Sequence, residues 1–391
     1  MVERVFYAPG RVEIGGNHTD HQHGRVLAAA VDLGISCRAS VNGSNIINIS
    51  SDGFGNITVD ITDLAPRHDD MGTTAALVRG VAAWFRSHGY PIGGFTGHVT
   101  SNLPVGIGLS SSAAFEVLVG SVIRGLFNAE ASDLEVALAG QYAENLYFGK
   151  PSGLMDQVAS SCGGLDMIDF LDPENPVLTP VNARFAGHRM CIVSTGGSHV
   201  DLTDDYGAIP LEMRTVAASF GKEFLRDVDP DEFFASLGDL RSLGGLRNLG
   251  GPRGLRGLRG LSDRAVLRAI HFFGENERVA RQAEALKIGD LTEFFRLIAE
   301  SGRSSLAYLQ NIYSPTHPEK QALTLALALC DRVLRGNGAY RVHGGGFQGT
   351  VLAFVPEGMV KDFEGQMLAV FGEGCCYFLD INQKGVREEG I

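Results

Sequence analysis

Apolar positions in the first half of the chain alternate between the spacing typical of strands and the spacing typical of helices. Residues 26–37 (VLAAAVDLGISC) form a long apolar run, and residues 46–59 hold two β-rich pieces around a glycine turn. These patterns predict a strand and a hairpin. Residues 73–88 repeat apolar positions at helical spacing and stop before Gly89, which predicts a helix. Further strands are expected at 97–103, 164–170 and 188–194, and further helices at 115–126 and 132–148.

The second half is richer in helical patterns. Helices are predicted at 210–220, 263–288, 290–308 and 320–334, and strands at 340–355 and 376–381. This mixture predicts an α/β (α+β) fold. A chain of 391 residues, at about 150 residues per domain, favours two to three domains. We place one boundary near residue 185, which gives an N-terminal domain 1–185 and a C-terminal domain 186–391.

The charge balance limits the partners that this chain can bind. Acidic residues number 45 and Lys plus Arg number 33, so the net charge of −12 disfavours nucleic acids and anionic membranes. No run approaches the about 18 apolar residues of a membrane span, and the N-terminus lacks the apolar core of a signal peptide. The six cysteines show no CxxC spacing, which argues against a disulfide scaffold or a zinc site. We therefore expect a cytoplasmic protein.

One low-complexity tract, residues 242–261, repeats Gly-Leu-Arg at 245, 254 and 257. The repeat is too short for a solenoid, and its glycines disfavour a long helix. We interpret the tract as a basic surface loop between helices, with a local anion or partner site as the alternative.

The most informative segment is residues 104–114 (PVGIGLSSSAA). Gly106 and Gly108 allow positive φ and a close backbone approach to a ligand. Ser110, Ser111 and Ser112 add hydroxyl groups just before a predicted helix, whose N-terminus favours anions. The segment predicts phosphate binding, although it lacks the Gly-Lys-Ser/Thr of a Walker A motif. An ordinary glycine turn with a serine cap is the alternative for this segment alone.

Three segments together resemble the galactokinase branch of the GHMP kinases. Residues 8–21 (APGRVEIGGNHTDH) are similar to the galactokinase pattern APGRVNLIGEHTDY. The Gly/Ser segment follows, with QYAE at 141–144 and GLMDQ at 153–157. Residues 341–350 (RVHGGGFQGT) are similar to the family's RMTGGGFGGC. Order and spacing agree from residue 8 to about residue 383.

The resemblance implies a two-domain GHMP kinase architecture with the active site in the cleft between the domains. ATP would lie over Gly106, Gly108 and the three serines, and Gly345 would help to close on the nucleotide. Ser112 and Glu144 match the family's Mg²⁺ ligands. Asp156 matches the catalytic aspartate, which takes the proton of the sugar's C1 hydroxyl. Arg11 matches the arginine that keeps this aspartate ionised and stabilises the transferred phosphoryl group.

The resemblance also implies a set of sugar contacts. His18 and Asp20 match residues that bind galactose hydroxyls, and Gly153 matches a backbone contact just before Asp156. Residues 198–206 are similar to the family's HSLASSEY, so Tyr206 maps to the sugar-facing tyrosine, although a core tyrosine is the alternative. His343 is expected to be structural.

The first motif departs from the family at a sugar-binding position. Asn17 stands where the family has a Glu that contacts the C6 hydroxyl of galactose. A Glu would repel a C6 carboxylate and a neutral Asn would not, so we expect recognition at C6 to be relaxed or shifted. The string HTDHQHG also resembles the HIDHQGG of galacturonate kinases. Glu13 and Gln348 differ from the family as well, and we expect both to be neutral to the chemistry.

The leading hypothesis is therefore an ATP- and Mg²⁺-dependent galactose 1-kinase, a monomer or weak homodimer. The first alternative is a kinase for galacturonate or another C6- or C2-modified sugar. The second is a sugar- and ATP-sensing regulator with little catalysis. Loss of Arg11 or Asp156 would favour the regulator, and both residues are present.

Overall fold

The computed structural model describes residues 2–52, 54–104, 106–150, 152–196, 203–242, 261–347 and 349–390. The Gly-Leu-Arg tract, apart from its end residues, and Gln348 lie outside the described residues. The described chain divides into two compact units. Unit 1 comprises residues 1–12, 28–166 and 379–391, and unit 2 comprises residues 13–27 and 167–378.

The units are therefore discontinuous in sequence, whereas we had expected two continuous domains that meet near residue 185. Strands β1 (Arg4–Gly15) and β2 (Arg25–Val41) each run from one unit into the other. The C-terminal strand β12 (Arg387–Glu389) pairs antiparallel with β1, which returns the chain end to unit 1. Long-range strand pairing of this kind leaves no mark in local composition.

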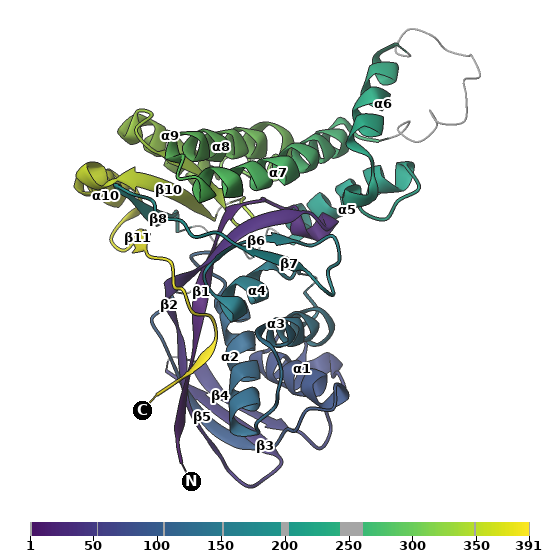
Figure 1. The fold of residues 1–391 in the computed structure, drawn as a ribbon, viewed down its shortest axis with the longest axis vertical. Helices are drawn as coiled ribbons and strands as arrows, with labels where there is room; N and C mark the ends of the chain where they lie inside the picture. Colours follow the sequence, from purple (N-terminus) through teal and green to yellow (C-terminus); the bar gives the residue numbers. More distant parts are fainter. Residues whose placement is uncertain are drawn as a thin grey trace. The chain divides into compact units, whose positions relative to one another are not determined.

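Unit 1 holds most of an eight-stranded sheet with the order β12-β1-β2-β5-β3-β4, and β6 pairs with β2 and β7. In β5 the residues Phe95, Gly97 and Val99 are buried and their neighbours are exposed, which is the alternation of a strand with one covered face. Figure 1 shows helices lying along one side of these strands. The remaining strands of the sheet are β3 (Ile46–Ser51), β4 (Phe54–Asp60), β5 (Phe95–Ser101), β6 (Leu165–Asp169) and β7 (Val177–Pro180).

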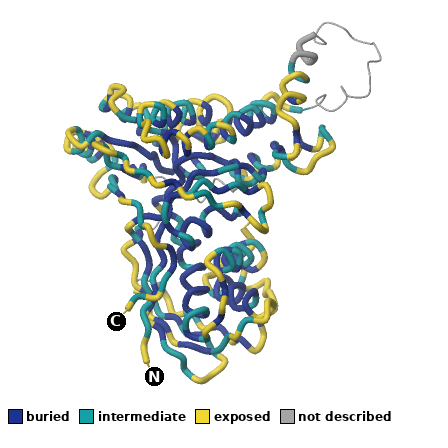
Figure 2. Tube along the Cα trace, in the orientation of Figure 1, coloured by how far each residue is buried: buried dark blue, intermediate teal, exposed yellow. Residues whose placement is uncertain are grey.

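Helices α1 and α3 of unit 1 begin at side-chain caps, and α2 begins at the serine-rich loop. Thr73 accepts from the N–H of Ala76 at the start of α1, and Ser132 and Glu135 form a capping box at the start of α3. α2 is buried on most of its surface, so it forms the centre of the helical layer (Figure 2). The helices are α1 (Thr74–Ser87), α2 (Ser111–Leu126), α3 (Asp133–Tyr142), a π-helix (Ala143–Phe148) and α4 (Met155–Cys162).

Unit 2 is built on a four-stranded antiparallel sheet with the order β11-β8-β10-β9. Helices α8, α9 and α10 pack against it, and α5 packs against α7. The strands are β8 (His188–Ser194), β9 (Ala339–His343), β10 (Thr350–Pro356) and β11 (Cys376–Leu379). The helices are α5 (Thr203–Ser219), α6 (Pro230–Ser242), α7 (Asp263–Lys287), α8 (Leu291–Ser304), a π-helix (Ser305–Leu309), α9 (Ala322–Leu334) and α10 (Val360–Phe371).

Most predicted elements are confirmed, and the differences have local causes. The predicted hairpin is β3 and β4, paired antiparallel. The predicted helix 132–148 continues past α3 as a π-helix, and the predicted strand 340–355 is two strands separated by a glycine segment. The long first strand β1, with α6 and α10, was not predicted, because residues 8–21 were interpreted only as a motif.

The predictions about membrane spans and about cysteines can be compared with the described residues. No described helix is both long enough and apolar enough to cross a membrane. All six cysteines are free thiols. Burial raises the pKa of the Cys37 and Cys162 thiols to about 12, so both remain protonated at neutral pH.

Candidate active site

The Gly/Ser segment of unit 1 enters α2 through three residues with positive φ. Gly106 has φ +80°, Gly108 has φ +72°, and Ser110 has φ +54°. Ser110 is the N-cap residue, yet its side chain makes no capping hydrogen bond. Its hydroxyl instead donates to Oδ2 of Asp156. A left-handed serine with a redirected side chain is a strained arrangement, and such strain is concentrated at functional sites.

Arg11 and Asp156 form a two-point ion pair beside this segment. Nε of Arg11 donates to Oδ1 of Asp156 at 2.6 Å, and Nη2 donates to Oδ2 at 2.7 Å. Nη1 donates to the carbonyl of Gly108, so the arginine also holds the glycine segment. The Arg11 side chain is 7% exposed and that of Asp156 is 31% exposed, so the carboxylate remains reachable.

The electrostatic environment keeps Asp156 ionised. Burial alone would raise the pKa of this carboxyl, but the charge and hydrogen bonds of Arg11 and the hydroxyl of Ser110 outweigh it. The net effect is a pKa below the ordinary value for Asp. Asp156 is therefore a carboxylate at neutral pH, able to accept a proton only from a donor that is becoming strongly acidic.

A second carboxylate cluster in unit 1 surrounds Glu144 in the π-helix. Its Oε1 accepts from Nζ of Lys150 at 2.9 Å, and its Oε2 accepts from Oγ of Ser152 at 2.8 Å. The amide of Gln157 donates both to Glu144 and to Glu116, each at 2.9 Å. Burial and the neighbouring Glu144 raise the pKa of Glu116 well above its ordinary value. The Gln157 amide thus joins two carboxyl groups, and that of Glu116 has the raised pKa.

The donor types in this cluster fit Mg²⁺. Glu144 supplies a carboxylate, and Ser112, an exposed residue in the first turn of α2, matches the hydroxyl ligand that the galactokinase resemblance implies. The residues that the structure describes contain no group of three or more His, Cys, Asp or Glu arranged to hold a metal. Mg²⁺ in nucleotide sites takes one or two protein oxygens and completes its shell from phosphate and water. Lys150, whose side chain is 62% exposed, provides a countercharge that another cation could replace.

In unit 2, the loop that begins at Gly16 is held by helix α7. Oε1 of Glu275 accepts from the N–H of Gly16 at 3.1 Å and from the N–H of Asn17 at 3.4 Å. Nε2 of His271 lies 2.9 Å from the carbonyl of Asn17. Although burial would raise the pKa of Glu275, the charge of Arg278 lowers it to about 2. The loop backbone is therefore fixed by a permanently ionised, buried carboxylate.

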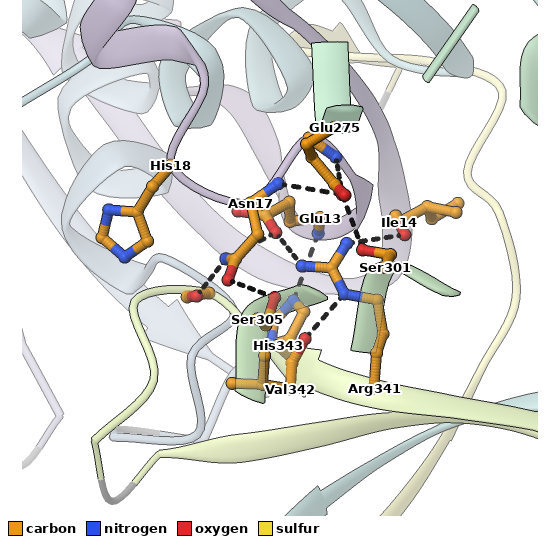
Figure 3. A network of polar contacts seen from close by, with 12 residues as sticks. Glu13, Ile14, Asn17, His18, Glu275, Ser301, Ser305, Arg341, Val342 and His343 are labelled. Atoms are coloured by element: carbon orange, nitrogen blue, oxygen red, sulfur yellow. Dashed lines mark hydrogen bonds and ion pairs between the residues drawn. The ribbon is translucent and has the colours of Figure 1, made fainter. Parts of the chain in front are cut away.

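The Asn17 side chain is fully buried and is bonded on every side (Figure 3). Its Nδ2 donates to Oε1 of Glu13 at 3.1 Å and to the carbonyl of Gly344 at 2.6 Å. Its Oδ1 accepts from Oγ of Ser305 at 3.3 Å and from Nδ2 of Asn311 at 2.9 Å. An amide has two N–H donors and two acceptor lone pairs, so the hydrogen-bonding capacity of Asn17 is used entirely within unit 2.

Glu13 ties this network to a buried arginine. Nη2 of Arg341 donates to Oε1 of Glu13 at 2.5 Å, and Nη1 donates to the carbonyl of Ile14 at 3.0 Å. Arg341 is fully buried, and the Glu13 side chain is 5% exposed. The glutamate that we expected to be neutral to the chemistry therefore provides the charge partner of Arg341 and orients Asn17. His343, expected to be structural, contacts the N–H of Glu13 and the hydroxyl of Thr350.

His18 adopts φ +59° and is a buried residue, 6% exposed. Nε2 lies 3.1 Å from the carbonyl of Gly345. A carbonyl can only accept, so Nε2 carries the hydrogen. Burial lowers the pKa of His18 to about 3, which leaves Nδ1 with a lone pair. Among the described residues Nδ1 has no hydrogen-bond partner.

Four side chains hold three successive carbonyls at residues 344–346. Asn17 binds the carbonyl of Gly344, His18 and Asn311 bind that of Gly345, and the Tyr206 hydroxyl donates to that of Gly346 at 3.0 Å. A Cβ on Gly345 would lie 2.0 Å from the Tyr206 ring, so this close approach requires glycine. Burial raises the pKa of Tyr206 to about 12, which keeps its hydroxyl a donor.

Comparison with known proteins places the chain in a family. Residues 2–41 match the galactokinase galactose-binding signature, and residues 76–164 match the GHMP kinases N terminal domain. Over 366 residues the chain is 30% identical to a galactokinase of Glaesserella parasuis serovar 5 (strain SH0165), covering 92% of this chain and 87% of that protein. The chain belongs to the galactokinase family.

Further relatives agree with this galactokinase-family assignment. A galactokinase of Actinobacillus pleuropneumoniae serotype 5b (strain L20) is 30% identical over 363 residues, which cover 92% of this chain and 86% of that protein. The structure of Lactococcus lactis galactokinase complexed with galactose superposes with a TM-score of 0.81 and 25% identity, covering 98% and 95% of the two chains. A mevalonate kinase structure, with a TM-score of 0.61 and 15% identity, shares the fold. The α/β two-domain GHMP kinase architecture is thus confirmed.

The structure gathers several of the residues predicted from the galactokinase resemblance, each group within one unit. Arg11, Ser110 and Asp156 meet in unit 1, and Asn17, His18 and Tyr206 meet around Gly345 in unit 2. Asp20 lies in the short 3-10 helix Asp20–Gln22, where its Oδ1 accepts from the N–H of His21. Gly153 lies in the segment that leads into α4.

Sequence analysis missed several polar residues that organise these groups: Glu116 and Gln157 in unit 1, and His271, Glu275 and Asn311 in unit 2. Glu116 lies among apolar residues in the buried middle of α2, and a charged residue in that setting is a usable signal. The partners from α7 and from Asn311 carry no such signal, because their role depends on contacts with residues far away in sequence.

Proposed function

We propose that this protein transfers the γ-phosphoryl group of ATP to the C1 hydroxyl of galactose, giving galactose 1-phosphate and ADP. The observation that carries the proposal is the two-point pair of Arg11 and Asp156, with Ser110 on the same carboxylate at the start of α2. The galactokinase-family membership supports the substrate.

Asp156 would act as the proton acceptor. As the C1 oxygen bonds to the γ-phosphorus and the bond to the β,γ-bridging oxygen breaks, the hydroxyl proton passes to a carboxylate oxygen, and ADP leaves. Phosphoryl transfer has a loose transition state with little nucleophile bonding, so a strong base is not needed. The lowered pKa of Asp156 therefore fits late proton transfer and substrate alignment. Arg11 would add a fixed positive charge beside the transferred group.

The Gly/Ser segment would bind the phosphates of ATP. Positive φ at Gly106 and Gly108 turns the backbone, and the free N–H groups of the first turn of α2 favour anions. Ser112 and Glu144 would hold Mg²⁺, which neutralises phosphate charge when bound. Lys150, which is paired with Glu144, would supply a positive charge close by.

Unit 2 would supply sugar contacts. The lone pair on Nδ1 of His18 is a buried acceptor that a sugar hydroxyl could satisfy. Asp20 and Tyr206 would add further contacts from this unit. Unsatisfied buried acceptors are costly, so a site built around one favours a ligand with a matching hydroxyl.

The galacturonate alternative depends on Asn17 facing the C6 substituent. The four protein partners of the Asn17 amide leave it no capacity for that contact, so Asn17 gives the alternative no direct support, and galactokinase-family membership favours galactose. The regulator alternative is disfavoured because Arg11 and Asp156 are not only present but paired. We also infer a cytoplasmic enzyme that acts as a monomer or weak homodimer.

The test is ADP release by the purified protein with MgATP and either D-galactose or D-galacturonate, with the phosphorylated carbon identified by NMR. Turnover on galactose at C1 supports the proposal. Turnover on galacturonate alone, or binding of either sugar without turnover, would contradict it in favour of the corresponding alternative.

A further inference from the structure

Residues 344–346 are three glycines, and their peptide groups would be free to rotate without side-chain anchors. Gly344 has φ +62° and Gly346 has φ +85°, both in the left-handed region. The orientation of the Gly345 carbonyl matters most, because it receives the Nε2 hydrogen of His18 at 3.1 Å. Whatever holds this carbonyl also decides which nitrogen of His18 presents a lone pair.

Asn311 is the second donor to that carbonyl. Its Nδ2 lies 3.2 Å from the carbonyl of Gly345 and 2.9 Å from Oδ1 of Asn17. Both partners are acceptors, so the nitrogen side of the Asn311 amide is fixed by chemistry. The Asn311 backbone also accepts from the N–H of Phe347 at 2.6 Å, and a Cβ on Gly346 would lie 2.0 Å from the same carbonyl. Asn311 thus contacts the glycine segment through both its side chain and its backbone.

The direction of each hydrogen bond in this network can be worked out starting from the charged group of Arg341. Arg341 donates to Glu13, which can only accept and therefore receives Nδ2 of Asn17. Oδ1 of Asn17 then has to face donors, and one of them is Nδ2 of Asn311. The second hydrogen of Asn311 and the Nε2 hydrogen of His18 occupy the two lone pairs of the Gly345 carbonyl. Each step leaves one orientation, since the reverse would place two donors or two acceptors face to face.

We propose that Asn311 is a positioning residue for sugar binding: through the Gly345 carbonyl it fixes the Nε2-protonated tautomer of His18, whose Nδ1 then accepts a hydrogen bond from the sugar. This inference rests on the proposed function for the identity of the sugar. The tautomer of His18 does not depend on the proposed function, so the claim about the tautomer and the claim about the sugar can fail separately. Asn311 is fully buried, and its Oδ1 has no hydrogen-bond partner among the described residues, so its side chain acts in this network through the two hydrogens of Nδ2.

The main test is Asn311→Asp, which keeps the shape but places an oxygen opposite two acceptors. We expect KM for galactose to rise about tenfold or more, the equivalent of losing one well-made hydrogen bond, while KM for ATP stays within about twofold. Asn311→Ala, which removes the donor without adding charge, should act in the same direction. Asn276→Ala is the matched control, because Asn276 belongs to the same unit and bonds Arg25 and Arg226 but not the glycine segment.

The direct readout is the tautomer of His18, measured by ¹⁵N NMR of the full-length protein labelled at histidine and assigned with His18→Gln. The wild-type protein should show a protonated Nε2 and an unprotonated Nδ1, and Asn311→Asp should lose this single state. An unchanged His18 spectrum in both Asn311 variants would overturn the proposal, as would KM values for galactose and ATP that rise together. A wild type with the expected tautomer but no galactose turnover would instead contradict the proposed function alone.

Discussion

The guanidinium of Arg11 donates two hydrogen bonds to the carboxylate of Asp156, from Nε to Oδ1 at 2.6 Å and from Nη2 to Oδ2 at 2.7 Å, although the two residues lie 145 positions apart in sequence. A planar, permanently charged donor that matches both carboxylate oxygens fixes the direction of those oxygens as well as their charge. The remaining exposure of the Asp156 side chain, 31%, leaves room for an incoming hydroxyl group. The first two predictions concern this ion pair.

Replacing Asp156 tests the proton acceptor. Asp156→Asn keeps the size of the side chain and removes its charge and basicity, so kcat should fall about 10²- to 10⁴-fold. ATP affinity should remain close to that of the wild type, measured by calorimetry with a non-hydrolysable ATP analogue. The surface variant Asp172→Asn serves as a control and should retain full turnover. Substantial kcat in Asp156→Asn would show that this carboxylate does not accept the proton.

Replacing Arg11 should change the pH dependence of the reaction. The wild-type pKa of Asp156 lies below its ordinary value, so the carboxylate is ionised and active throughout the neutral range. In Arg11→Met, burial is no longer opposed by the guanidinium, so the pKa of Asp156 rises and the acid limb of kcat moves to higher pH. Arg11→Lys retains a charge and should shift less. Identical acid limbs in all three proteins, measured from pH 4 to 8, would contradict this coupling.

Glu144 and Glu116 offer a matched pair for testing the metal ligand, because one Gln157 amide donates to both. Glu144→Gln should raise the Mg²⁺ concentration needed for half-maximal activity about tenfold or more, since a neutral amide binds Mg²⁺ more weakly than a carboxylate does. Glu116→Gln should leave that concentration nearly unchanged, because Glu116 is fully buried and burial raises the pKa of its carboxyl, which makes it the weaker candidate for a cation ligand. Equal Mg²⁺ titrations for the wild type and Glu144→Gln would remove Glu144 as a ligand.

Burial of His18 should make stability depend on pH. Its pKa is about 3 in the folded protein and 6.5 in the unfolded chain, so the unfolded state binds the extra proton between these values. The contribution to stability is complete above pH 6.5 and is lost progressively as the pH falls towards 3. From pH 7.5 to 5 the free energy of unfolding should drop on the order of 2 kcal/mol on account of this residue.

Urea denaturation of the wild type and His18→Gln at the two pH values measures that contribution. The variant should lose less stability than the wild type between pH 7.5 and 5. His317→Gln, at a partly exposed position, should behave like the wild type. A His18→Gln protein that loses as much stability as the wild type would show that His18 is not a buried neutral imidazole.

Much of the fold was predictable because its signals are local. The hairpin of β3 and β4, helix α1 and helix α7 follow apolar periodicity, glycine turns and side-chain caps, all of which lie within a few residues of the elements they define. The division into units was not predictable in this way. It depends on β1 and β2 running through both units and on the pairing of Val5 with Glu389.

The sequence by itself determined the chemistry-bearing residues: a glycine and serine segment before a helix, and motifs whose order matches the galactokinase pattern and includes Arg11, Asp156 and His18. Only the tertiary structure decided what Asn17 does. Local comparison presented it as a sugar contact, whereas its partners Gly344 and Asn311 lie 327 and 294 residues away and use its whole amide. The physical reason is that a side chain's chemistry is fixed by its type, but its free hydrogen-bonding capacity is what remains after the fold has satisfied it.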